Sequence, residues 1–175
     1  MESPSDFLKE NLEFILGRAK TGPVLDLACG KGRNGLFLSR MGFDVHFWDK
    51  NEQNLEFIRS VAEKENINVT IRCVDLEKEV DLLLPVEYYG IVLVFKYLHR
   101  PLIPYIKQSV ICDGLVVYNT FTHQQVQVGK PQNPNFLLKD NELTDLFNDW
   151  IILKYYEGRL DNPERYMAGI VAQKG

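Results

Sequence analysis

The sequence of 175 residues holds 20 Lys and Arg against 24 Asp and Glu, with a formal net charge of -4 and a pI near 5.4. This balance argues against nucleic-acid binding, because neutralising phosphates needs a basic surface, and it favours a small-molecule partner. The three cysteines are widely spaced and form no C-x-x-C pair, so neither a disulfide scaffold nor a metal site is indicated. No apolar run is long enough for a bilayer and no signal-peptide pattern starts the chain, so we expect a soluble, cytoplasmic protein without membrane association.

We expect residues 1–175 to form one domain, because a chain of this length can bury most of its unfolded surface around one core. The first predicted element is a helix that is capped at Ser3 and Pro4 and ends at Gly17. Apolar strand patterns and helical patterns then alternate along the chain. The predicted strands are residues 24–28, 45–48, 69–74, 90–94, 115–120, 150–156 and 166–172, and the predicted helices are residues 51–64, 102–110 and 139–147, with another that begins near residue 36.

This alternation predicts an α/β fold, in which a mostly parallel seven-stranded sheet is covered by helices on both faces. The last two predicted strands are separated by a turn at residues 161–163. Such a connection is too short for a parallel crossover. We therefore expect the last strand to run antiparallel to its neighbour.

The strand at residues 24–28 leads directly into a glycine turn that opens a helix. Gly30, Gly32 and Gly35 stand in G-x-G-x-x-G order, which is typical of nucleotide-cofactor sites because the backbone can turn tightly and approach a ligand. Asp26 stands four positions before Gly30. Its carboxylate would repel a pyrophosphate but suits a positively charged amino-acid moiety, such as that of S-adenosylmethionine.

Two further aspartates stand at predicted strand ends. Asp49 ends the second strand, where a carboxylate can accept hydrogen bonds from both hydroxyls of a ribose. Asp75 ends the third strand, where a carboxylate and the backbone N–H of Leu76 can bind the edge of adenine. Each aspartate alone has an alternative interpretation as a turn or cap residue. Their common register with the glycine turn favours an adenosine cofactor.

With these residues the chain resembles the class I S-adenosylmethionine-dependent methyltransferases, whose first motif is similar to D-L-A-C-G-K-G-R-N-G from Asp26 onwards. Within them it is most similar to small bacterial enzymes of the tellurite-resistance (TehB-like) type, through Cys29, Arg33-Asn34 and residues 97–100 and 129–138. The resemblance runs from about residue 6 to the C-terminus. It implies a Rossmann-like class I methyltransferase fold.

The resemblance also implies S-adenosylmethionine as cofactor and S-adenosylhomocysteine as product. The cofactor site that it indicates consists of Asp26, Ala28, Cys29, Gly30, Gly32, Arg33, Asn34, Asp49, Lys50, Asp75, Leu76 and Phe95. We interpret Cys29 as a small packing residue and not as a nucleophile. One departure from the family pattern is Gly90, where many relatives carry an aspartate at the start of the fourth strand.

Three residues after the fourth strand are candidates for the acceptor side of the reaction. His99 is the first, because ligands bind at the carboxyl ends of parallel strands and the pKa range of histidine suits a base; capping of the next helix is the alternative. Tyr97 and Arg100 are weaker candidates, and Arg100 is either a ligand for an anionic substrate or a solvated side chain. The polar loop at residues 123–138 is predicted to be a lid over the acceptor, with a connecting loop as the alternative.

The leading functional hypothesis is methyl transfer to a small-molecule acceptor, such as a thiol or a metalloid oxyanion. An activated methyl group needs a nucleophile in line with it and no obligatory catalytic residue. Two alternatives stay open, an NAD-dependent oxidoreductase and a non-catalytic cofactor-binding module on the same fold. We expect a monomer or a homodimer.

Overall fold

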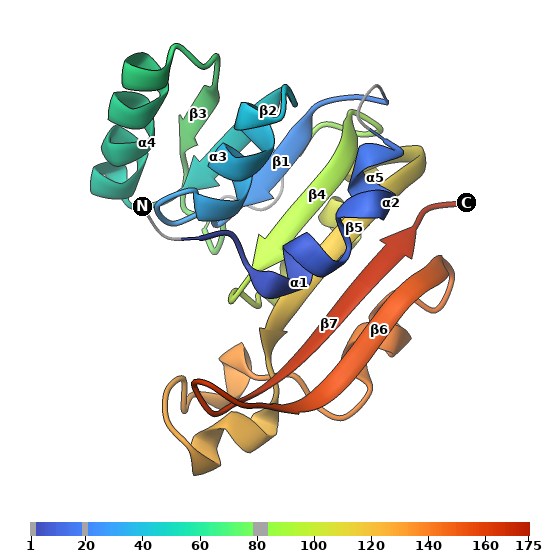
Figure 1. The fold of residues 1–175 in the computed structure, drawn as a ribbon. Helices are drawn as coiled ribbons and strands as arrows, with labels where there is room; N and C mark the ends of the chain where they lie inside the picture. The colour runs from blue at the N-terminus through green and yellow to red at the C-terminus, as the bar shows by residue number, and fades with distance from the viewer. Residues whose placement is uncertain (1–2, 19–20, 79–83) are drawn as a thin grey trace.

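The computed structural model of the protein describes residues 3–18, 21–78 and 84–175. Within them one seven-stranded sheet has the order β3-β2-β1-β4-β5-β7-β6 (Figure 1). The strands are β1 (Val24–Leu27), β2 (Val45–Asp49), β3 (Thr70–Cys73), β4 (Tyr89–Phe95), β5 (Val110–Phe121), β6 (Ile151–Leu160) and β7 (Arg165–Gln173).

The strands β1 to β5 run parallel, so that their carboxyl ends meet at one edge of the sheet. All four residues of β1 are buried, as expected for a central parallel strand that is covered on both faces. The strand β7 pairs antiparallel with both β5 and β6. The predicted antiparallel pairing of the last two strands is therefore confirmed, and β7 lies between β5 and the edge strand β6.

The helices cover both faces of the sheet and form two hydrophobic clusters. Alternate residues of one strand belong to different clusters, such as Leu25 to one and Val24 to the other, because side chains alternate across a sheet. One cluster includes residues of α1 (Asp6–Glu10), α2 (Leu12–Leu16), α3 (Arg33–Arg40) and α4 (Glu52–Glu65). The other includes residues of α5 (Ile103–Ser109) and α6 (Glu142–Leu146). No helix among the described residues is both long and apolar enough to cross a membrane.

The prediction of one continuous N-terminal helix is wrong, because the chain breaks between α1 and α2 at Asn11. The buried Asn11 side chain donates from Nδ2 to the Phe7 carbonyl at 2.8 Å, and such bonds compete with regular helix geometry. The predicted cap is also wrong, since Ser5 and not Ser3 precedes the first helical residue. The Ser5 N–H donates to Asn34 Oδ1 at 2.8 Å, which attaches the N-terminal segment to α3.

Two other helices begin later than predicted. The segment after β4 first forms a 3-10 turn, Arg100–Leu102, before α5 begins at Ile103. The helix expected from residue 139 begins at Glu142, because Asn141 adopts a left-handed conformation with φ of 59°. The Glu142 carboxylate accepts from the Lys139 N–H at 2.8 Å, so the preceding residues form a turn.

Packing explains the departure from the family pattern at Gly90. A Cβ atom at this position would lie 2.6 Å from Thr21 Oγ1 and 3.0 Å from the Gly22 nitrogen. The Gly90 N–H donates to the Pro23 carbonyl at 3.0 Å. Because the backbone of residues 22–23 approaches β4 so closely, an aspartate would not fit here without moving that segment.

Candidate functional site

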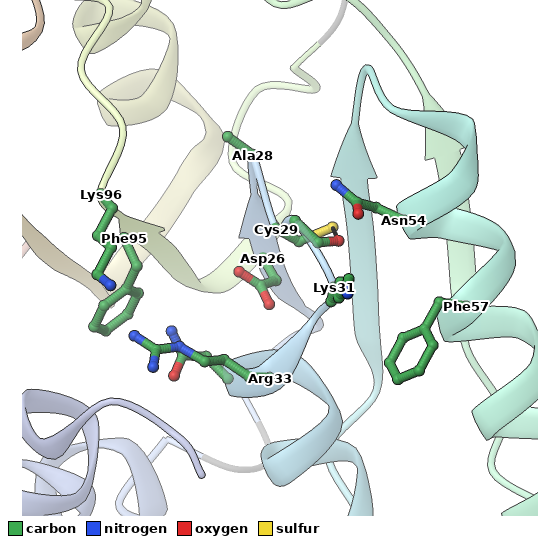
Figure 2. A pocket seen from close by; sticks show the side chains of 11 residues that line it. Asp26, Ala28, Cys29, Lys31, Arg33, Asn54, Phe57, Phe95 and Lys96 are labelled. Atoms are coloured by element: carbon green, nitrogen blue, oxygen red, sulfur yellow. Dashed lines mark hydrogen bonds between the residues drawn. The ribbon is translucent and has the colours of Figure 1, made fainter. Parts of the chain in front are cut away.

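A cavity of about 850 Å³, called the main cavity below, lies at the carboxyl ends of β1 and β4 (Figure 2). Asp26 contributes from β1, Phe95 from the end of β4 and Arg33 from the first turn of α3. Ligands of open α/β sheets bind at this edge, where the chain passes from strands to helices. The other lining residues are Ala28, Cys29, Gly30, Lys31, Asn34, Asn54, Phe57 and Lys96.

The turn between β1 and α3 depends on its glycines for two different reasons. Gly30 and Gly32 have positive φ values of 54° and 69°, which residues with a side chain rarely adopt. Gly35 is required by packing, because a Cβ atom there would lie 2.7 Å from Asp26 Oδ2. At Gly30 nothing lies within 4 Å of the Cβ position, so the turn faces open space on the cavity side.

Asp26 is the buried acid of the cavity, with a relative exposure of 2%. Its Oδ2 accepts from the Gly35 N–H at 2.9 Å. Burial raises the pKa of this carboxyl group to about 7, and the nearby Asp49 carboxylate adds to the rise, while the Gly35 amide and Arg33 oppose it. A cationic group bound beside Asp26 would favour its ionised form.

Asp49 lies behind the glycine turn and does not line the cavity. Its Oδ2 accepts from the Gly30 N–H at 2.7 Å, and its Oδ1 accepts from the Asn51 N–H at 2.8 Å. The carboxylate thus connects the turn after β1 to the start of α4. Its assignment to ribose hydroxyls stays a prediction, in which the ribose would take the place of one of these backbone donors.

The predicted adenine residues lie around the end of β3, outside the cavity lining. Asp75 Oδ1 accepts from the Glu77 N–H at 3.2 Å, and Oδ2 lies 3.5 Å from Lys78 Nζ. Leu76 is buried, while Lys50 is exposed and lies 3.6 Å from Glu77. Their contact with adenine also stays a prediction.

None of the three acceptor-side candidates lines the main cavity. His99 occupies the cap position before the 3-10 turn, but its side chain makes no capping hydrogen bond. The Tyr97 hydroxyl is buried without a hydrogen-bond partner among the described residues, and burial raises its pKa. Arg100 lies against the polar loop, where it donates to Glu142 Oε1 at 2.5 Å and to the Leu137 carbonyl at 2.8 Å. Through these hydrogen bonds Arg100 attaches the loop to α6.

Backbone hydrogen bonds join the two ends of the loop at residues 123–138. The Leu138 N–H donates to the Phe121 carbonyl at 2.9 Å, and the His123 N–H donates to the Leu138 carbonyl at 2.8 Å. Leu137 and Leu138 are buried, whereas Phe136 is 45% exposed, so the two leucines pack the end of the loop into the fold. The lid function of this loop stays a prediction.

Three residues of this cavity, Asn54, Phe57 and Lys96, were not predicted from the sequence. Lys96 follows β4 in a left-handed conformation with φ of 55°, and its exposed side chain gives no pattern. Asn54 and Phe57 stand one helical turn apart on α4, so they face the same side. This i, i+3 pair on the helix that follows Asp49 is the sequence pattern that could have indicated Asn54 and Phe57 as cavity residues. Figure 2 shows Arg33 directed toward Phe95 and Lys96 and away from Phe57.

Comparison with known proteins shows one family for the chain. Residues 10–164 match the family model described as tellurite resistance protein TehB. Two proteins named "Probable S-adenosyl-L-methionine-dependent methyltransferase TehB", from Haemophilus influenzae strains 10810 and Rd, are each 34% identical to this chain over 142 and 145 residues. These matches cover 77% of this chain and 48% of each relative, so the chain spans about half the length of the curated relatives it matches.

Solved structures agree with this relationship. The crystal structure of TehB from Haemophilus influenzae has a TM-score of 0.76 and 27% identity, and the match covers 97% of this chain and 66% of that chain. The crystal structure of a SAM-dependent methyltransferase from Aquifex aeolicus has a TM-score of 0.69 and 17% identity, and the match covers 97% of this chain and 90% of that chain. The second likeness shows the fold alone, which confirms the predicted α/β methyltransferase fold.

Proposed function

Since the chain belongs to the tellurite resistance protein TehB family, we propose that it is an S-adenosylmethionine-dependent methyltransferase that acts on a small-molecule acceptor. The matches cover only 48% of each curated relative. The activity of the whole protein is therefore part of this proposal. The observation that supports it most is the buried carboxyl group of Asp26, which lines the same cavity as Gly30. At Gly30 the space next to the backbone is open.

The charge of the site favours this cofactor over NAD. A buried carboxylate next to the glycine turn would stand close to the pyrophosphate of a dinucleotide and repel it. The same carboxylate pairs favourably with the ammonium group of a methionine moiety, and Arg33, which also lines the cavity, can bind the moiety's carboxylate. The residues present therefore fit S-adenosylmethionine, because Asp26 and Arg33 match the opposite charges of its methionine moiety.

The remaining cofactor contacts follow the strand ends. Asp49 would bind the ribose hydroxyls, Asp75 and the Leu76 N–H would bind adenine, and Phe95 would pack against the cofactor. When bound, S-adenosylmethionine supplies a methyl group on a sulfonium, which moves to a nucleophile's lone pair while the electrons of the broken C–S bond remain on sulfur. The protein's own task is to orient the nucleophile and exclude water.

The acceptor belongs to the same proposal. We assign it to the small nucleophiles, a thiol or a metalloid oxyanion, with His99 and Tyr97 as the candidates on the acceptor side. A base is needed only where the nucleophile carries a proton at working pH. His99 is half-buried at the end of the β4 segment, from which it can act if the loop at residues 123–138 closes.

Calorimetry with S-adenosylhomocysteine and NAD tests the proposal, with Gly30→Val as the variant. We expect micromolar binding of S-adenosylhomocysteine by the native protein and none by Gly30→Val, because a β-branched side chain fills the space at the turn. The matched control is Gly42→Val, since Gly42 also has positive φ and nothing within 4 Å of its Cβ position but lies outside the cavity. Both variants place a β-branched residue at a positive φ, of 54° at Gly30 and 89° at Gly42. Equal binding by both, or binding of NAD alone, would contradict the proposal.

A further inference from the structure

A second cavity, of about 380 Å³, adjoins the first one and has no role in the cofactor contacts above. Its walls come from distant parts of the chain: the N-terminal segment around Ser5, the end of β5 at Asn119 and the start of β7 at Arg165. Arg33 and Lys96 line both cavities, so the two meet at these residues. A methyl acceptor has to approach the cofactor from a neighbouring space of this kind.

The second cavity has a positive lining. Arg33, Lys96 and Arg165 are its cationic residues, and Asp6 is its acidic one. The Asp6 carboxylate is already paired with Lys9, at 2.6 Å between Oδ1 and Nζ. The excess of positive charge favours an anion in the cavity.

Among the described residues, Arg33 and Arg165 make no side-chain hydrogen bond, although both interact electrostatically with the Asp6 carboxylate. The Nε atom of Arg165 is buried without a hydrogen bond, and Arg33 makes neither a hydrogen bond nor a close ion pair there. Buried N–H donors of proteins are nearly always paired, because an unpaired donor loses its hydration without compensation. Because Arg165 lines the cavity, an anionic ligand group there would pair with its guanidinium and offset part of this cost.

Asn119 is a fixed polar residue of the second cavity and lies next to Phe95 in the register of β4 and β5. Its Nδ2 donates to Tyr156 Oη at 2.7 Å and to the Ala168 carbonyl at 3.0 Å. Because both amide hydrogens are used, its side-chain oxygen is the group that remains for a ligand. Asn119 and Arg165 line the second cavity but not the cofactor cavity, whereas Arg33 lies at the junction. The charged group of a ligand at Arg165 would therefore lie outside the cofactor cavity.

We propose that the second cavity is the methyl-acceptor site and that it selects a small organic anion with its charged group and its nucleophilic atom at opposite ends. Arg165 binds the charged group, and the nucleophile lies toward Arg33 and the cofactor cavity. This inference rests on the proposed function, but it replaces His99 and Tyr97 as acceptor-side residues, since neither lines this cavity. A single-centre oxyanion carries charge and nucleophile on the same group and cannot occupy both ends, so the two kinds of acceptor are distinguishable.

Ligand-observed NMR on the protein saturated with S-adenosylhomocysteine tests this site under reducing conditions. The probes are 3-mercaptopropionate, the neutral alcohol 3-mercaptopropan-1-ol of the same length, and selenite. We expect 3-mercaptopropionate to bind at least about tenfold more tightly than the alcohol, because only the former makes a charge-assisted bond to a guanidinium. Equal binding of the two thiols, binding of selenite alone, or binding of no probe would overturn the inference.

The variant Arg165→Gln tests whether Arg165 causes the tighter binding of 3-mercaptopropionate. It should weaken 3-mercaptopropionate binding at least about tenfold and leave the alcohol unchanged, since one charged partner is lost. Arg159→Gln is the matched control, because Arg159 belongs to the same hairpin but is exposed and paired with Asp161 and Glu164. If Arg165→Gln keeps full binding, the inference fails. Calorimetry of S-adenosylhomocysteine separates this failure from a failure of the proposed function, because Arg165 does not line the cofactor cavity.

Discussion

The carboxyl group of Asp26 is buried at the end of β1, and this burial raises its pKa to about 7. The proposed cofactor contact needs the charged form, because only a carboxylate pairs with the ammonium group of the methionine moiety. Below pH 7 the free protein therefore holds a proton on Asp26 that ligand binding must release. Binding and ionisation of this one residue are linked.

We predict that the affinity for S-adenosylhomocysteine falls by up to about tenfold for each pH unit below 7 and levels off above it, as expected for release of one proton. Calorimetry between pH 5.5 and about 7.5, in buffers of different ionisation enthalpy, measures both the affinity and the proton release. A pH-independent affinity in the native protein would contradict the role of Asp26.

The variant Asp26→Asn is the control for this linkage. It should bind weakly and without the pH dependence, since an amide cannot ionise. Its unfolding gives an independent check of the sign. A folded-state pKa above the unfolded value near 3.8 means that the native protein loses stability as pH rises toward 7. Relative to the native protein, Asp26→Asn should become more stable over the same interval, as measured by urea unfolding.

At the scale of elements, one ion pair attaches the second half of the polar loop to α6. Arg100 joins it to α6 through Glu142 and donates to the Asn135 and Leu137 carbonyls. The Arg100 side chain is one-third exposed and that of Glu142 is 14% exposed, so solvent screens this pair only partly. Arg100 therefore fixes the second half of the loop to the fold, while in the first half Gln125 Oε1 accepts from the Tyr166 N–H of β7 at 2.8 Å.

We predict that Arg100→Gln accelerates amide hydrogen exchange at residues 134–138 and lowers the unfolding free energy by about 1–3 kcal/mol, because a charged hydrogen-bond partner is removed from the Glu142 carboxylate. Arg59→Gln is the control, since Arg59 pairs with Glu52 and Glu56 on the exposed side of α4. It should leave the loop unchanged. Equal exchange rates in the native protein and in Arg100→Gln would show that Arg100 does not hold the loop.

The sequence predicted the elements that have strong local signals. Buried apolar runs located the strands, and the glycine turn with Asp26 located the main cavity, because these features depend on neighbouring residues. The break at Asn11 was missed, since it depends on burial of that side chain among other elements. The second cavity was also beyond prediction. It brings together Ser5, Asn119 and Arg165, whose proximity follows from the order of strands in the sheet and from no local pattern.

At the scale of the whole molecule, one hydrophobic cluster runs through both halves of the chain. It includes Leu25 and Trp48 from the first half and Trp150 and Ala172 from the second. The strand β7 joins the β6 edge to β5 in the middle of the sheet. Unfolding of the C-terminal hairpin alone would therefore expose residues of the shared cluster. Such continuity favours a single cooperative unit for residues 1–175.

We predict that both halves unfold in one transition, observed by the fluorescence of the two single-tryptophan variants. Trp48→Phe retains Trp150 and reports on the second half, while Trp150→Phe retains Trp48 and reports on the first. Each urea transition should coincide with that variant's own circular dichroism. S-adenosylhomocysteine at about 100 times its Kd should stabilise both by roughly 2.7 kcal/mol, because a ligand that binds only the folded state stabilises the entire cooperative unit. If the Trp150 signal changes at lower urea than the circular dichroism, or does not respond to the ligand, the hairpin folds separately and residues 1–175 are not one unit.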